Sequence, residues 1–307
     1  MSFDRDHLSA YNPSKLFTVD QFTITGDSIA VGAGESGQTE VVPFEVAWSV
    51  YSNLGSNVSV IKPLDETNAI GGDSAWVYFA EDFFDLTGRR SVWDAYATSG
   101  SAITRTSTAN SHWDYEFPTW NAEDGGHRLF DPDGNQVAEA KSLIQRGTDA
   151  LTFDKKYLIY AGGSYDARAL TEGRVTKQHI TDKLVEAFEW WRDNHGYHKM
   201  LIFESGVIGL TEAAADADQL SNRDMIGLRE AQNDACAHDD IINVYSHCAA
   251  AGDPFNTITS DANGRWASGH QNKDEGGHYH ADMAEIMGRT AAWNLAVTEG
   301  YVEGSII

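Results

Sequence analysis

The chain has 307 residues, 41% of them hydrophobic, and a formal net charge of −24. This length and apolar content are enough to bury one large core. The acidic surface excludes nucleic acid as a partner, because phosphate binding needs clustered Lys and Arg. No apolar run reaches the roughly 18 residues of a membrane span, and the first residues, Met1 to Asp6, lack the pattern of a secretory signal.

The charge composition also bears on the salt concentration in which the protein works. The chain carries 46 acidic residues against 22 basic ones, and only nine of the basic residues are lysines. Such a surface is strongly hydrated and repels itself, and salt screens that repulsion. We therefore expect a saline or halophilic source and a cytoplasmic or virion-associated location. Cys236 and Cys248 are interpreted as two thiols rather than as a disulfide.

Five short apolar segments along the chain predict strands. Each has four to six residues, is rich in β-branched or aromatic types, and is almost continuously apolar, which is typical of a strand buried on both faces. The segments are Phe22–Thr25, Val92–Ala97, Tyr157–Tyr160, Met200–Phe203 and Ile241–Tyr245.

Helical spacing of apolar residues recurs between and after these strands. It predicts helices over 180–194, 222–236 and 281–297. Strands that alternate with helices favour a parallel sheet with helices on both sides. We expect an α/β fold: a three-layer α/β/α sandwich with a five-stranded parallel sheet, in one domain spanning 1–307. Two Gly- and Asp-rich stretches, at about 101–150 and 251–277, are expected to be long loops that carry function.

Ser28 is the first candidate for chemistry. It belongs to Gly26-Asp27-Ser28, directly after the first predicted strand. A serine at the carboxyl end of a strand lies at the sheet edge where open α/β sheets place their ligands. Taken alone, the tripeptide fits a turn with a helix-capping serine better than it fits a nucleophile. As a nucleophile, Ser28 needs a neighbouring base to take its proton.

The base should be a histidine that a carboxylate orients. His278 lies just before the last predicted helix, and Glu275 precedes it by three residues. That spacing can bring an imidazole and a carboxylate within hydrogen-bond reach on one loop. His280 competes with His278 for the role of base, and Asp274 competes with Glu275 for the role of acid.

Glycines after the second and third strands could supply donors to an oxyanion. Gly100 follows the second strand, and Gly163 follows the third in Gly162-Gly163-Ser164-Tyr165-Asp166. A glycine lets backbone N–H groups approach a substrate closely, although each of these stretches also fits a simple turn.

Together these residues resemble the conserved blocks of SGNH hydrolases. Gly26-Asp27-Ser28 resembles block I, Gly100 block II, Gly163 to Asp166 block III, and Glu275 to His278 block V. The closer likeness is to the sialate O-acetylesterase-like group and carbohydrate esterase family 6. Leu228 to Gln232 resembles that group's Arg-x-x-Gln stretch, and Gly288-Arg289 resembles part of its C-terminal motif. Two departures stand out: Tyr165 replaces the oxyanion-hole Asn, and Glu275 replaces Asp.

The resemblance implies a flavodoxin-like SGNH fold and a serine esterase that hydrolyses O-acyl esters on a carbohydrate. It implies catalysis by Ser28, His278 and Glu275 (or Asp274), with Ser28, Gly100, Gly163 and Tyr165 at the oxyanion and no metal or other cofactor. Trp113 and Trp120, in the first long loop, are candidates for stacking on a sugar. The expected partners are an acylated glycan or a small ester, and an oligomer or a virion assembly stays open.

Two other functions stay open at this stage. The first is a non-catalytic or weakly catalytic glycan-binding protein on the same fold, such as a viral tail or spike component, because a fold does not fix a function. The second is a lyase or transferase that uses the same triad.

Overall fold

The computed structural model describes seven strands, five helices and some of the residues that connect them. These are residues 19–26, 30, 42, 46–52, 59–63, 75–97, 102–104, 153–203, 225–238, 240–245 and 281–305. The long segments expected as loops, about 101–150 and 251–277, lie outside these residues except for 102–104.

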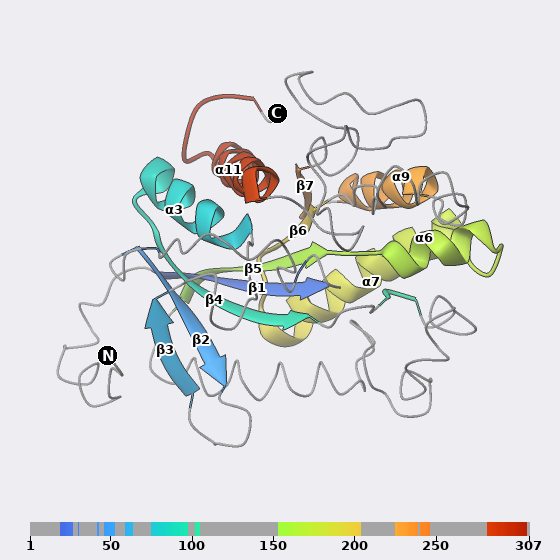
Figure 1. Ribbon diagram of the computed structural model, residues 1–307, viewed down its shortest axis with the longest axis horizontal. Coiled ribbons are helices and arrows are strands. Elements are labelled where there is room, and N and C mark those ends of the chain that lie inside the picture. Colours follow the sequence, from blue (N-terminus) through green and yellow to red (C-terminus); the bar gives the residue numbers. More distant parts are fainter. Residues whose placement is uncertain are drawn as a thin grey trace.

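One sheet of seven strands forms the centre of the described part of the chain, in the order β3-β2-β4-β1-β5-β6-β7 (Figure 1). All neighbouring pairs are parallel except β2 and β3, which are antiparallel. The strands are β1 (Val19–Gly26), β2 (Ala47–Ser52), β3 (Ser59–Pro63), β4 (Arg90–Ala97), β5 (Phe153–Ala161), β6 (Lys199–Phe203) and β7 (Ile241–Tyr245).

The predicted α/β class and parallel sheet are confirmed, but the predicted count of five strands is wrong. The two additional strands, β2 and β3, lie at one side of the sheet, and β3 ends at Pro63 as edge strands often do. Polar residues interrupt both strands, Ser49 in β2 and Lys62 in β3, and neither strand holds an apolar run longer than two residues, so a search for longer apolar runs misses them. The five predicted strands, numbered in chain order, lie in the order 2-1-3-4-5, which is the flavodoxin-like order.

The three predicted helices are present, and the described part of the chain holds two further helices that were not predicted. The helices are α3 (Ala75–Thr87), α6 (Ser164–Thr171), α7 (Lys177–His195), α9 (Met225–Cys236) and α11 (Ala281–Thr298). In α3, seven of the 13 residues are buried, and the first six are all apolar, so the start of this helix is a continuous apolar run without helical spacing. Helix α6 has only eight residues, too few for a periodic pattern.

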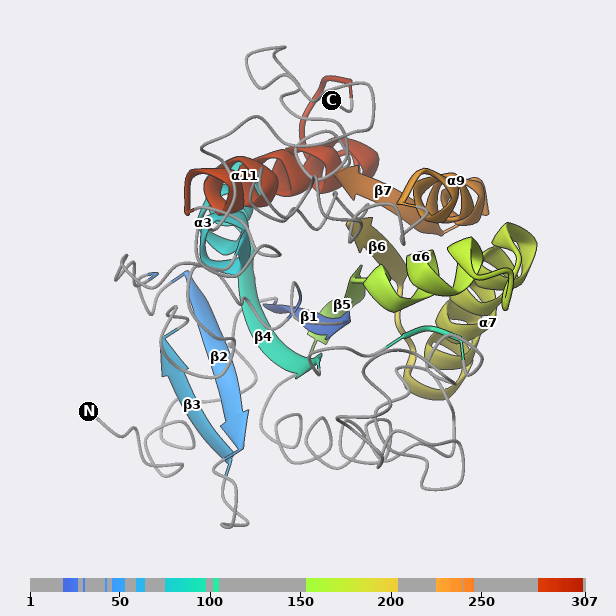
Figure 2. The same cartoon turned by 45° about the vertical axis from the view of Figure 1, so that its right-hand side comes forward.

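Helices cover both faces of the sheet, which gives the expected three layers. Alternate residues of β1, β5 and β6 point to opposite faces, because side chains in a strand have a period of two. Phe22, Ile159 and Leu201 join one core with α3 and α11. Leu158 and Met200 join the other core with α6, α7 and α9. Figures 1 and 2 show α3 and α11 side by side, away from α6 and α7.

Ion pairs hold the amino-terminal edge of the sheet. Arg89, after α3, bonds Asp20 of β1 through Nε and Nη2, each at 2.6 Å. Glu299, at the end of α11, has a side chain only 2% exposed and pairs with Lys155 of β5, and it lies within 3.7 Å of Lys199 of β6. The charged groups thus fasten helix ends to strand starts. Among the described helices, none could span a bilayer.

Candidate functional site

Most of the predicted catalytic residues lie outside the described residues. These are Ser28, Gly100, Trp113, Trp120, Asp274, Glu275 and His278. Gly163 and Tyr165 are described, and so are Gly26 and Ala30, two residues on either side of Ser28, and the helix that follows His278. The described part of the candidate site is therefore the framework at the carboxyl edge of the sheet.

The central strands end together at this edge. Gly26, the last residue of β1, lies in register with Ala97 of β4 on one side and Ala161 of β5 on the other. In the 2-1-3-4-5 order, the direction of chain winding reverses between β1 and β5. Ligands of open α/β sheets bind outside the strand ends at such a reversal. The ends of β1 and β5 are thus where a site is expected.

Gly26 is confined to glycine by two independent constraints. Its φ is +141°, and a Cβ built there would lie 1.8 Å from the carbonyl oxygen of Ala161. No side chain fits such a gap, and L-residues rarely adopt such a φ. Beyond Ser28, Ala30 is fully buried, and its carbonyl accepts a 3.0 Å hydrogen bond from Nε1 of Trp76 in α3. The chain is therefore held two residues before and two residues after Ser28.

The turn from β5 into α6 is also closely packed, although less tightly than Gly26. Gly163 has a φ of +118°, and a Cβ there would lie 2.9 Å from Cδ2 of Leu228. The buried Gln232 donates from Nε2 to the carbonyl of Gly162 at 3.1 Å. Leu228 and Gln232 bound the stretch of α9 that the sequence singled out, and the structure gives both residues a role in holding this turn.

The first turn of α6 also holds the segment that follows β4. Asp166 is fully buried, and its carboxylate accepts from the backbone N–H of Ile103 at 3.0 Å and of Thr104 at 3.2 Å. It also accepts from Oγ1 of Thr104 at 3.0 Å. Tyr165 is 7% exposed and packs against Ala102. Sequence reasoning did not assign Asp166 a role, although the block III resemblance includes it.

Helix α11 approaches the same edge with its N-terminus. Its C-terminal end, at Glu299, contacts the starts of β5 and β6. At Gly288 it crosses the start of α3, where an added Cβ would lie 2.2 Å from the carbonyl oxygen of Ala75. Ala75 precedes Trp76, which bonds Ala30. Helix α11 therefore runs antiparallel to the strands, and its start at Ala281, three residues after His278, points toward the carboxyl edge.

A buried carboxyl group lies in the middle of the sheet, away from the strand ends. Oδ2 of Asp94 in β4 accepts a 2.9 Å hydrogen bond from Nε2 of Gln21. Burial raises the pKa of Asp94 to about 7, against the smaller lowering effects of Thr23, Gln21 and the Lys156 charge. Nearby, Oγ1 of Thr23 and the hydroxyl of Tyr197 are 2.5 Å apart.

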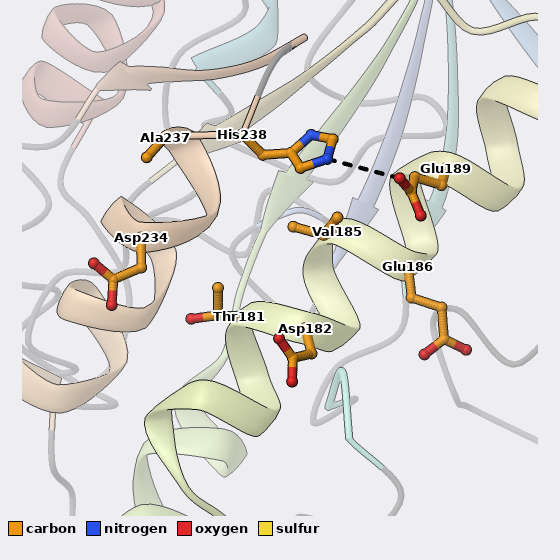
Figure 3. A pocket seen from close by; sticks show the side chains of 8 residues that line it. All are labelled: Thr181, Asp182, Val185, Glu186, Glu189, Asp234, Ala237 and His238. Atoms are coloured by element: carbon orange, nitrogen blue, oxygen red, sulfur yellow. Dashed lines mark ion pairs between the residues drawn. The ribbon is translucent and has the colours of Figure 1, made fainter.

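A separate groove of about 400 Å³ lies between α7 and α9 (Figure 3). His238 at its rim pairs with Glu189 across 3.7 Å. Its remaining lining residues are Thr181, Asp182, Val185, Glu186, Asp234 and Ala237. None of the predicted site residues lines this groove. Among the described residues, no group of three or more His, Cys, Asp or Glu is arranged to hold a metal ion.

Comparison with known proteins gives a likeness in structure only. No protein-family model and no curated protein matches the sequence. A protein from Arabidopsis thaliana is similar with a TM-score of 0.55 at 12% identity, over 92% of this chain and 99% of that one. This likeness shows a shared fold.

Two further solved structures are similar at lower scores. A carbohydrate acetylesterase from Xanthomonas citri has a TM-score of 0.46 at 15% identity; the match covers 91% of this chain but only 56% of that one. An alpha/beta hydrolase enzyme from the metagenome of Lake Arreo, Spain, has a TM-score of 0.47 at 12% identity, over 94% of this chain and 99% of that one.

Proposed function

We propose that the chain is a serine esterase that hydrolyses O-acyl esters, with Ser28 as its nucleophile. The observation that carries the proposal is Gly26, which ends the central strand at the reversal point and has no room for a side chain. Consecutive Cα atoms are about 3.8 Å apart, so Ser28 lies within about 8 Å of both Gly26 and Ala30. The framework thus supports a serine presented at the edge where a ligand is expected.

The direction of α11 supports His278 as the base. His278 lies three positions before Ala281, so its Cα is no further than about 11 Å from that of the first helix residue. That start points toward the edge at which β1 ends. Glu275, or Asp274, would accept from the imidazole and hold it in the tautomer that can take a proton from serine.

The proposed reaction has two acyl-transfer steps. His278 takes the proton of Ser28 Oγ as that oxygen attacks the ester carbonyl carbon. The N–H groups of Ser28, Gly100 and Gly163 stabilise the oxyanion, with the Tyr165 hydroxyl as a candidate fourth donor. His278 then protonates the leaving alcohol, and an acyl-enzyme remains. Water, deprotonated by His278, attacks the acyl carbon and releases the acid and Ser28. These steps need no metal or organic cofactor.

An acetylated neutral sugar is the proposed substrate class. Trp113 and Trp120 would provide aromatic faces for a sugar, and the resemblance to carbohydrate esterases points to an acetyl group. The net charge of −24 disfavours anionic polymers, because like charges repel unless salt screens them.

Hydrolysis assays test the proposal directly. The wild-type protein should release acetate from p-nitrophenyl acetate and from acetylated xylose. Ser28→Ala should lower kcat by about 10⁴–10⁶-fold, as removal of a serine nucleophile does. Ser305→Ala, which removes an exposed hydroxyl near the C-terminus, is the matched control and should leave kcat unchanged.

The outcomes separate the alternatives. Activity on the small ester alone would support the esterase activity and contradict the glycan substrate. A folded wild-type protein without activity on either ester, but with affinity for acetylated glycans, would favour the non-catalytic glycan-binding or virion protein. Transfer of the acetyl group to an added alcohol, rather than to water, would favour a transferase.

A further inference from the structure

We infer that Asp166 is a positioning residue that fixes the chain after β4, and with it the proposed oxyanion donor Gly100. This inference rests on the proposed function, since it assigns Asp166 a part in the same reaction. Asp166 would not touch the substrate. It would act through backbone amides of the 102–104 segment, which it binds from the first turn of α6.

Asp166 holds the segment after β4 through several hydrogen bonds. Its carboxylate is fully buried, and it accepts from two successive backbone N–H groups, at Ile103 and Thr104. The Thr104 hydroxyl donates to the same carboxylate. A buried carboxylate is costly unless donors compensate it, and hydrogen bonds to a charged acceptor are about twice as strong as neutral ones. The segment is thus held firmly at one end.

The packing of Tyr165 strengthens the same connection. Tyr165, the neighbour of Asp166, is buried against Ala102. Two consecutive residues of α6 therefore bind three consecutive residues after β4. Helix α6 is itself fixed at its start, where Gln232 donates to Gly162 and Leu228 packs on Gly163.

The length of the chain links this anchor to Gly100. Gly100 lies three residues after Ala97, which pairs with Gly26 at the end of β1, and two residues before Ala102. Both ends of this short segment are fixed. Because Gly100 is two residues from Ala102, the Cα atoms of these two residues are at most about 8 Å apart. A shift of about 1 Å in a positioning group can cost about 10²-fold in rate. Loss of the Asp166 hydrogen bonds would therefore displace Gly100, the proposed oxyanion donor.

Asp166→Asn tests this inference. The amide nitrogen of Asn cannot accept, so at least one of the bonds to Ile103 and Thr104 is lost at nearly constant size. We expect kcat on p-nitrophenyl acetate to fall about 10–100-fold, with KM changed less than about threefold, because the oxyanion forms only after binding. Hydrogen exchange at the Ile103 and Thr104 amides should become faster by at least about tenfold.

Two threonine variants complete the experiment. Thr104→Val removes the hydroxyl bond to Asp166 but keeps the Thr104 backbone N–H, and it should lower kcat about threefold to tenfold. Thr171→Val is the matched control, since the Thr171 hydroxyl, also in α6, donates only to the Ala167 carbonyl, at 3.2 Å. Its kcat and its exchange at Ile103 and Thr104 should equal those of the wild type.

The inference is overturned if folded Asp166→Asn keeps kcat within twofold of the wild type, or if exchange at the two amides is unchanged. If Asp166→Asn does not fold, Thr104→Val decides by the same two criteria. An inactive wild-type protein would contradict the proposed function instead. Amide exchange would then test the positioning role of Asp166 without an activity assay. Faster exchange at Ile103 and Thr104 in Asp166→Asn would support that role, and unchanged exchange would overturn it.

Discussion

The two edges of the sheet are built by different means. At the amino edge, charged side chains connect strand starts to helix ends, as Arg89 does with Asp20 and Glu299 with Lys155. At the carboxyl edge, glycines and buried polar side chains hold backbone atoms, as at Gly26 and Asp166. Ion pairs tolerate small shifts of long side chains, whereas close backbone contacts do not. The comparison shows where the fold demands accurate backbone placement, and this is the edge that carries the proposed chemistry.

The difference between the two edges should be largest when one glycine at each edge is replaced by alanine. Gly26→Ala places a Cβ 1.8 Å from the Ala161 carbonyl oxygen. We expect a loss of about 3–5 kcal/mol in the free energy of unfolding, or failure to fold. If it folds, its esterase activity should fall at least about 10²-fold, because the chain leading to Ser28 is displaced.

Gly88→Ala, at the amino edge, is the matched control. Gly88 has a φ of +68°, but an added Cβ would meet no atom within 4 Å. Only the backbone cost of about 1–2 kcal/mol applies there, and activity should persist. Chemical denaturation and kinetic assays of both variants provide the measurement. Equal losses of stability would contradict the account of the carboxyl edge.

Asp94→Asn should give the next largest effect, a gain in stability at alkaline pH. The folded pKa of Asp94, about 7, is raised above its ordinary value of 3.8. The stability it contributes is therefore complete below the unfolded pKa and is lost as pH rises through the folded pKa. Asn does not ionise, so the variant should be more stable than the wild type by on the order of 3 kcal/mol at pH 8.

The pH profile is the test of this prediction. The difference in unfolding free energy between Asp94→Asn and the wild type should be near zero at pH 4, grow up to pH 7, and stay constant above. Asp193→Asn, which alters an exposed pair with Arg192, should show no such growth. A flat difference for Asp94→Asn would mean that its carboxyl group ionises as if exposed.

Glu299→Gln should have a smaller, opposite effect at the amino edge. Burial alone would raise the pKa of Glu299, but the Lys155 hydrogen bond and the charges of His198, Lys155 and Lys199 outweigh it and lower the pKa. The stability from this group is therefore present above the unfolded pKa and is lost as pH falls through the lowered folded pKa. We expect a loss of about 2 kcal/mol at pH 7 that disappears in acid, with activity unchanged.

Glu186→Gln is the surface counterpart for Glu299. The Glu186 side chain is 62% exposed and pairs with Lys183 in the same helix, so its loss should cost less than about 0.5 kcal/mol. Thermal melts between pH 3 and pH 8 would compare the two variants. Similar small losses for both would show that the Glu299 pairs contribute no more than surface pairs do.

The sequence predicts the inner part of this fold better than its edge. The strands near Ile159 and Leu201 hold continuous apolar runs because helices cover both faces, and this pattern is visible without a structure. Strands β2 and β3 were missed because polar residues interrupt them and no apolar run within either is longer than two residues. Helix α3 was missed because its first six residues are all apolar and buried, so its start is a continuous apolar run without helical spacing.

The candidate site also has features that the sequence could predict and features that it could not. The glycine of Gly26-Asp27-Ser28 could be predicted because a turn after a strand favours glycine, and the structure adds the reason that Ala161 leaves no room for a side chain. The role of Asp166 could not be derived from spacing, because its partners lie 62 and 63 residues earlier in the chain. The positions of Ser28, Gly100, Glu275 and His278 stay predictions.

Covalent labelling of Ser28 is the most direct test of the central claim. The folded wild-type protein would be treated with a fluorophosphonate, and the modified peptide identified by mass spectrometry. The account predicts one adduct per chain, on Ser28, that is absent in Ser28→Ala and retained in Ser305→Ala. An adduct on another serine, or no adduct on a folded wild-type protein, would contradict it.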